Sequence, residues 1–189
     1  MTGWKGASPE CSSGEGAQVK GSDLSVRAGL SRIVPAHAGA NESRMSILLC
    51  GVLLLLFAVM GWLSAGTLTD DDIGRFLSAR AAFEHPDKIL GLWTRPLFML
   101  LYAVPAQLGY GAVELTTAAV CALTCWLSIR SAARLGESHP LWAALFLAFQ
   151  PMFLLLSFSA LTEPLAALCL AASIERLLAR SETCRCRRR

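Results

Sequence analysis

Charged residues are scarce in this chain of 189 residues. They make up 16% of it, whereas hydrophobic residues make up 54%, a ratio too apolar for a typical soluble domain. The net charge is only +3, and the arginines cluster at the termini and in one short loop instead of forming a stripe with interleaved aromatic residues. This distribution excludes a nucleic-acid-binding surface.

A metal-ligand pattern is also lacking. Four of the seven cysteines lie inside apolar runs: Cys50, Cys121, Cys125 and Cys169. A free cysteine in such a run behaves as a small hydrophobic residue. Cys184 and Cys186 have polar neighbours, but no histidine or second cysteine pair completes a zinc-binding pattern. We therefore expect no metal site built from cysteines.

Long apolar runs are what the chain does contain. They lie between Met45 and Leu178, and both ends of the chain are polar. This arrangement is typical of a protein embedded in a bilayer. Residues 1–44 are rich in Gly, Ser and Ala without an apolar face, which predicts a disordered tail. Because Met45 opens the first apolar run, it is also an alternative start of the chain.

The first transmembrane helix is predicted at residues 45–66. These 22 residues carry no charge and would form a helix of about 33 Å, which crosses a hydrocarbon core of about 30 Å. A cleaved signal peptide is the alternative, since Ser64, Ala65 and Gly66 supply small residues near the end of the run. The run exceeds the usual signal-peptide core in length, which favours an uncleaved helix.

Residues 67–110 are predicted to form an external loop with interfacial helices. Apolar residues from Ile73 to Ala81 recur every three or four positions, which predicts a short amphipathic helix. Its first turn carries the aspartates 70–72, a position favoured by the helix dipole and by capping of free N–H groups. Residues 96–108 are predicted to form an apolar helix in the outer interface.

Three further spans are predicted at residues 111–129, 141–158 and 164–178. The 34 residues between Arg95 and Arg130 contain one charge and would form about 51 Å of helix, too long for one crossing. A proline and two glycines divide this stretch. The alternative is two short crossings of about 17 residues each, at the lower limit of a span.

Four crossings put both ends of the chain on one side, together with the loop at residues 130–139. That side holds the arginine excess, including the basic tail at residues 179–189, so the positive-inside rule predicts that it is cytoplasmic. Pro151 lies inside the third span and is predicted to kink it. The fold class expected is therefore an all-α integral membrane protein, located in the cell inner (plasma) membrane.

Acidic residues collect on the predicted outer face. Asp70, Asp71 and Asp72 follow the first span, and Glu114 and Glu163 border the outer ends of later spans. Carboxylates there can act as a general base or hold a divalent cation beside a phosphate. A divalent cation is therefore the cofactor that these residues suggest. The aspartates can equally be a solvated capping run, and the two glutamates can extend to the lipid headgroups.

Three short motifs follow one another in the chain. An acidic pair opens the segment Asp-Asp-Ile-Gly-Arg-Phe at residues 71–76, Trp-Thr-Arg-Pro-Leu at residues 93–97 leads into an apolar helix, and Ser-Phe-Ser-Ala-Leu-Thr-Glu-Pro fills residues 157–164. In this order they resemble the start of the membrane-embedded GT-C glycosyltransferases. The resemblance covers residues 45–178 and is nearest to bacterial members similar to protein O-mannosyltransferases.

The resemblance implies transfer of a sugar from a polyprenyl-phosphate donor to an acceptor on the outer side, with inversion at the anomeric carbon. It implies that the catalytic carboxylates are Asp71 and its acidic neighbour Asp72, with Asp70, which precedes the pair, as an alternative in register. Arg95 would meet the lipid phosphate, although anchoring at the interface explains it as well. The partners expected are this donor and membrane lipid, and substrate binding would also involve the remaining acidic positions: Asp70, Glu114 and Glu163.

Members of this class carry further spans after the fourth. We therefore expect the chain to correspond to the N-terminal portion of such an enzyme, as a truncated or frameshifted product that is inactive alone. The alternative is a small four-helix membrane protein with a binding, assembly or transport-accessory role. Apolar spans encoded in a downstream frame would favour the enzyme, and a clean intergenic gap would favour the accessory protein.

Overall fold

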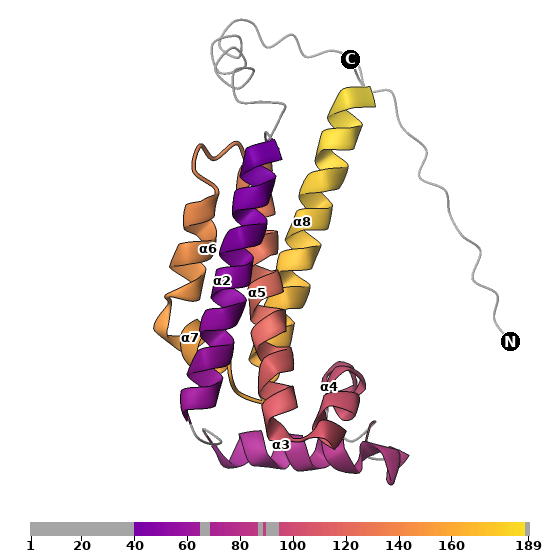
Figure 1. Cartoon of the computed structure of the whole chain (residues 1–189). Helices are drawn as coiled ribbons and strands as arrows, with labels where there is room; N and C mark the ends of the chain where they lie inside the picture. The colour runs from indigo at the N-terminus through magenta and orange to yellow at the C-terminus, as the bar shows by residue number, and fades with distance from the viewer. Residues whose placement is uncertain (1–39, 65–68, 87–88, 90–94, 188–189) are drawn as a thin grey trace, which may run out of the picture. The chain divides into compact units, whose positions relative to one another are not determined.

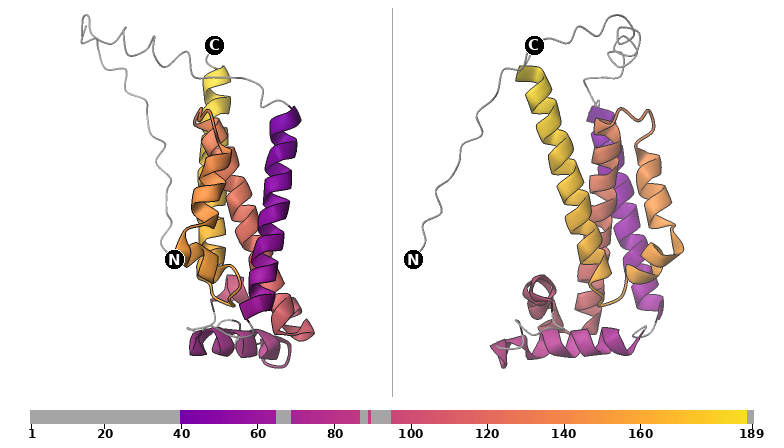
Figure 2. Two further views of the ribbon diagram at one scale, coloured as in Figure 1. Left: turned by 60° about the vertical axis from the view of Figure 1, so that its left-hand side comes forward. Right: turned by 180° about the vertical axis from the view of Figure 1, so that it is seen from behind.

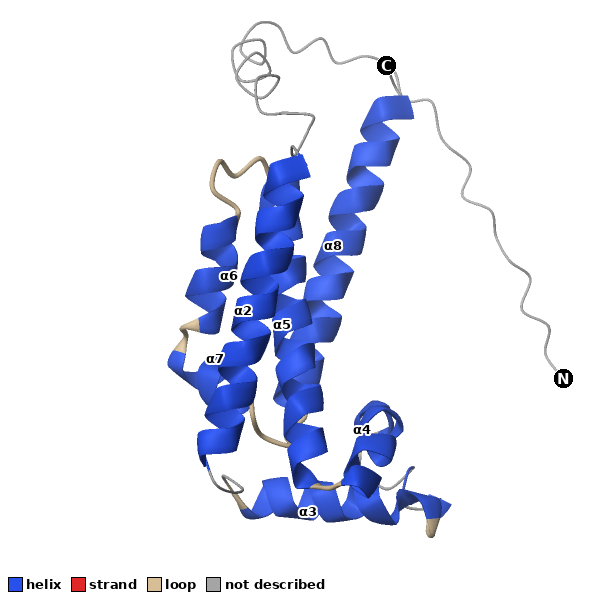
Figure 3. Cartoon of the chain, in the orientation of Figure 1, coloured by secondary structure: helices blue, strands red, loops and turns tan. Residues whose placement is uncertain are grey.

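The structure, a computed structural model, describes residues 40–64, 69–86, 89 and 95–187. Within these ranges every regular element is a helix, and no strand occurs (Figure 3). The long elements are α2 (Ala40–Ser64), α5 (Tyr110–Arg134) and α8 (Glu163–Arg187), and the shorter ones are α3 (Asp70–Arg80), α4 (Pro96–Leu108), α6 (Leu141–Ala148) and α7 (Pro151–Leu156). The predicted all-α class is confirmed.

The helices form an antiparallel bundle with α3 lying across one end. In Figure 1, α2 runs towards α3, α5 runs away from it, α6 and α7 return, and α8 runs away again. Figure 2 shows the same arrangement from two other sides. Helix α5 is central, because α2, α4, α6 and α8 all pack against it. The start of α3, the start of α5 and the turn before α8 therefore meet at one end.

Two clusters of buried side chains hold the bundle together. One joins α2, α5, α6 and α7 and contains Phe57, Cys121, Cys125 and Phe153. Cys121 and Cys125 are free and fully buried, as expected of cysteines that serve as small packing residues. The other cluster joins α3, α4 and α5 to the turn before α8 and includes the fully buried Tyr102.

Two of the described helices are long and apolar enough to cross a membrane, at Ser43–Ser64 and Tyr110–Arg134. In the first, only 17% of the apolar window is buried in the protein, whereas the core helix of a soluble protein would be mostly buried. Its outward side chains are large and apolar, and Trp62 is 86% exposed. The two helices thus indicate membrane association, by their length and composition.

The first predicted span differs from α2 at its beginning. Helix α2 starts at Ala40, so the last residues of the predicted disordered tail are helical, and residues 1–39 lie outside the described residues. Polar helix formers before Met45, including Glu42 and Arg44, extend the helix by a turn beyond the apolar run. The small residues Ala65 and Gly66 at the end of the predicted span also lie outside the described residues.

The predicted third helix at residues 141–158 is two helices. Helix α6 ends at Ala148, and α7 begins at Pro151 after Gln150, which has an extended backbone. Proline lacks an N–H and its ring collides with the preceding turn, so it occupies the first turn of a new helix instead of kinking a continuous one. Helix α8 in turn continues to Arg187, beyond the predicted residue 178, because no Gly or Pro follows to end it.

Candidate functional site

The end of the bundle formed by α3, the starts of α4 and α5, and the turn at residues 157–162 carries most of the predicted site residues. We call it the acidic end, after the three aspartates in the first turn of α3. Thr69 caps this helix, and its hydroxyl accepts the N–H of Asp72 at 3.3 Å. The Ser/Thr cap and the acidic first turn explain why α3 begins at Asp70.

Asp72 is fully buried and bonded on both oxygens. Its Oδ2 accepts the Tyr110 hydroxyl at 2.7 Å, and its Oδ1 accepts the Ala160 backbone N–H at 2.5 Å. Asp72 therefore joins α3 to the start of α5 and to the turn before α8. A carboxylate held in this way has no face open to an acceptor substrate, so the geometry gives Asp72 a positioning role instead of the predicted catalytic one.

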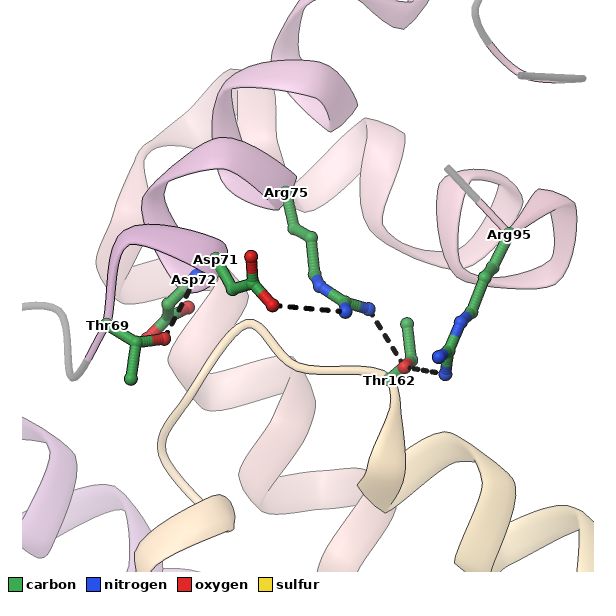
Figure 4. Close-up of polar contacts among 6 residues, drawn as sticks. All are labelled: Thr69, Asp71, Asp72, Arg75, Arg95 and Thr162. Carbon is green, nitrogen blue, oxygen red and sulfur yellow. Dashed lines mark hydrogen bonds and ion pairs between the residues drawn. The ribbon is translucent and has the colours of Figure 1, made fainter. Parts of the chain in front are cut away.

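Asp71, the next residue along the same helix, points to the surface. Its side chain is 81% exposed, and Oδ2 lies 3.8 Å from Nη2 of Arg75, one helical turn later (Figure 4). Arg75 in turn reaches Thr162, in the turn before α8. Asp71 is thus an accessible carboxylate beside a guanidinium, in the position that the resemblance implies for a catalytic base.

Two guanidiniums converge on the hydroxyl of Thr162. Nη1 of Arg75 donates to Thr162 Oγ1 at 2.9 Å, and Nη1 of Arg95 donates to the same oxygen (Figure 4). The hydroxyl is neutral, so it balances neither charge. Exposed carboxylates lie at the same end, but the planar N–H donors of the two arginines suit the oxygens of a phosphate group.

Arg95 has an unusual backbone conformation, with φ of 44° at the residue before α4. A non-glycine residue at positive φ costs about 1–3 kcal/mol and persists only where its surroundings fix it. Here the strained residue lies directly before Pro96, and its guanidinium reaches Thr162. Strain of this kind gathers at functional sites, which supports a role for Arg95 in binding.

The other predicted residues lie nearby in different settings. Asp70 and Glu163 are both exposed, at the first turns of α3 and α8, and Glu163 follows Thr162 directly. Glu114 lies on α5 beside Gly61 of α2, where an added Cβ would be 3.7 Å from the Cβ of Glu114. Its Oε1 is buried and has no hydrogen-bond partner among the described residues.

A polar network continues beneath the site. The hydroxyl of Tyr102 lies 3.0 Å from that of Thr117, which in turn donates to the Ser159 carbonyl at 3.0 Å. Burial raises the pKa of Tyr102 to about 12, although its hydrogen bond with Thr117 lowers it. The network ties α4 and α5 to the same turn that holds Ala160 and Thr162, so the turn is fixed from two sides.

Four contributors to the site had no predicted role: Arg75, Tyr110, Ala160 and Thr162. The sequence did contain a signal for Arg75, because its position four residues after Asp71 puts both side chains on one face of the helix. Tyr110, Ala160 and Thr162 have no such signal, since 38 to 88 residues separate them from the α3 residues that they contact.

The predicted divalent cation has no cluster of ligands among the described residues, where no three His, Cys, Asp or Glu side chains come together to hold a metal ion. Trp93 and Thr94, part of the second sequence motif, lie outside the described residues. No family model matches the chain, nor does any curated protein or solved structure.

Proposed function

We propose that the chain is the N-terminal part of a membrane glycosyltransferase of the GT-C type. It transfers a sugar from a polyprenyl-phosphate donor to an acceptor on the non-cytoplasmic side of the plasma membrane. One observation carries the proposal: an accessible carboxylate, Asp71, lies beside the guanidinium of Arg75, which meets the guanidinium of Arg95 at Thr162. A base next to a phosphate-binding pair is what displacement of a lipid phosphate by an acceptor requires.

The proposal includes four membrane crossings with both chain ends in the cytoplasm. Helices α6 and α7 together form the third, and α8 forms the fourth. Large apolar side chains that face outward on these helices support it, among them Phe146, which is 75% exposed, and Leu170, which is 64% exposed. Such side chains favour contact with lipid over water. The acidic end is then the outer end of the bundle.

The reaction follows from the positions of the charged groups. The acceptor hydroxyl loses its proton to Asp71, and its oxygen forms a bond to the anomeric carbon. The bond from that carbon to the phosphate oxygen breaks, and the electron pair leaves with the lipid phosphate. Arg75 and Arg95 stabilise the departing negative charge, and a single displacement inverts the anomeric carbon.

The remaining residues bind substrate in this mechanism. Glu163 is exposed next to Thr162 and can accept hydrogen bonds from sugar hydroxyls, and Asp70 is exposed in the first turn of α3. Glu114 lies deeper, near enough to Asp72 for their charges to interact. Helix α4 follows Arg95 and turns large apolar side chains outward, including Leu100, which is 69% exposed. That face suits the isoprenoid chain of the donor.

The test is a transfer assay on the chain extended by the spans that follow it in such enzymes. Asp71→Asn keeps the size of the side chain but removes the base, and we expect the rate to fall about 10²- to 10⁴-fold. Asp70→Asn is the matched control, one residue earlier in the same exposed turn, and should fall much less. Equal, near-wild-type turnover in both variants would exclude Asp71 as the base.

A further inference from the structure

The end of the bundle opposite the acidic end carries a buried ion cluster, and we call it the arginine end. Glu175 of α8 is the centre of the cluster, with a side chain that is 8% exposed. Its Oε1 lies 2.9 Å from Nη2 of Arg130 and 3.0 Å from Nη2 of Arg134, both on α5. One buried carboxylate therefore holds two guanidiniums and links α5 to α8.

The cluster and its surroundings have an excess of positive charge. Glu175 balances one of its two arginines, and Arg176 and Arg180 follow on the exposed surface of α8, one helical turn apart. Glu137, in the turn after α5, lies within hydrogen-bond distance of its neighbour Ser138. Arg176 and Arg180 face solvent, so they are placed to attract an anion.

Aromatic and apolar side chains lie beside these arginines. The guanidinium of Arg130 lies over the ring of Trp126, 4.7 Å from its centroid, and its own side chain remains 42% exposed. Leu177, between Arg176 and Arg180, is 67% exposed. Tryptophan, arginine and exposed leucine occur together at the level of lipid headgroups, where one end of each side chain meets hydrocarbon and the other meets water.

We propose that the arginine end binds the phosphate group of anionic phospholipids, through Arg130, Arg176 and Arg180. A guanidinium has five N–H donors in a planar fork, so Arg130 can hold Glu175 and still donate to phosphate oxygens. The apolar neighbours favour a lipid over a soluble phosphate, because the acyl chains cover them. The inference depends on membrane insertion and not on sugar transfer, so failure of either proposal leaves the other open to its own test.

The experiment measures lipid binding to the full chain purified in detergent. Native mass spectrometry and thermal unfolding are followed during titration with phosphatidylglycerol, or with phosphatidylcholine that has the same acyl chains. We expect retained adducts and a raised melting temperature with phosphatidylglycerol. Arg130→Gln, Arg176→Gln and Arg180→Gln should each weaken this binding about fivefold, the effect of one arginine near an anionic headgroup.

The matched control is Arg80→Gln, an exposed arginine in the last turn of α3 at the other end of the bundle. Its binding should equal that of the wild type. Because Arg176 and Arg180 are exposed, their variants keep the test valid even if Arg130→Gln weakens the fold. Equal binding of the two lipids, or equal losses in Arg80→Gln, would overturn the proposal. Displacement of the lipid by glycerol phosphate at comparable concentration would also overturn it, because it would assign the site to a soluble anion.

Discussion

Two neighbouring aspartates have opposite environments. Successive residues of an α-helix are rotated by about 100°, so Asp71 and Asp72 leave α3 in different directions. Asp72 turns inward and accepts two hydrogen bonds, whereas Asp71 stays in solvent beside Arg75. The acidic pair therefore separates into a residue that fixes the turn before α8 and a residue that stays exposed to solvent.

Asp72→Asn should destabilise the protein. The substitution replaces the charged acceptor of the Tyr110 hydroxyl, and hydrogen bonds to charged groups contribute about 1.5–3 kcal/mol. Thermal unfolding in detergent measures the effect, with Asp70→Asn, at an exposed position, as the control. Tyr110→Phe should lose part of the same energy. If Asp72→Asn is as stable as Asp70→Asn, the carboxylate does not hold the three segments together.

Arg95→Gly separates backbone strain from binding. Glycine tolerates φ of 44°, so the variant should be at least as stable as the wild type, with a gain of up to about 1 kcal/mol. It also lacks the guanidinium, so binding of a polyprenyl phosphate should weaken about tenfold or more. Unfolding and binding are measured on the same preparation. A variant that binds normally would remove Arg95 from the phosphate site.

At the scale of elements, α2 and α5 approach closely at one glycine. An added Cβ at Gly61 would lie 3.2 Å from the Cβ of Phe158 and 3.7 Å from the Cβ of Glu114. This contact brings the end of α2 against the start of α5, next to the acidic end. The absence of a side chain at residue 61 thus allows the helices to pack near the site.

Gly61→Leu should cost about 1–3 kcal/mol, as overpacking of a buried contact does. Gly51→Leu is the matched control on the same helix, because nothing lies within 4 Å of an added Cβ at that position. The comparison of melting temperatures removes the general effect of replacing glycine in a helix. Equal stability of the two variants would show that α2 does not pack closely at Gly61 against Phe158 and Glu114.

Local sequence signals, such as proline and glycine at helix ends, locate most of these elements. Pro96 and Gly109 bound α4 on both sides, so its predicted range of 96–108 is confirmed. The split of the third helix shows the limit, since Pro151 predicts a disturbance but not whether the helix bends or starts again. In the site, local spacing links Asp71 to Arg75. The contacts with Thr162 depend on how distant segments pack, which no local pattern encodes.

At the scale of the whole bundle, the two ends differ in charge. Carboxylates open α3 and α8 at the acidic end, beside Arg75 and Arg95, whereas at the other end Glu175 pairs with Arg130 and Arg134, and Arg176 and Arg180 are exposed. This polarity matches the positive-inside rule when the arginine end is cytoplasmic. The proposed reaction requires that orientation, because the acidic end must then meet its donor and acceptor outside the cell membrane.

The central claim is tested most directly by labelling single cysteines, placed at four positions on a cysteine-free background, to find which side of the membrane each one faces. The positions are exposed residues: Glu84 and Ser138 lie in turns, Glu163 opens α8, and Ser181 lies in its last turns. A membrane-impermeant thiol reagent added to intact cells should label the cysteines at 84 and 163 and leave those at 138 and 181 unlabelled until the membrane is opened. Protection of position 163 together with 138 would contradict the account, because α6 and α7 would then not return the chain to the outer face that carries Asp71.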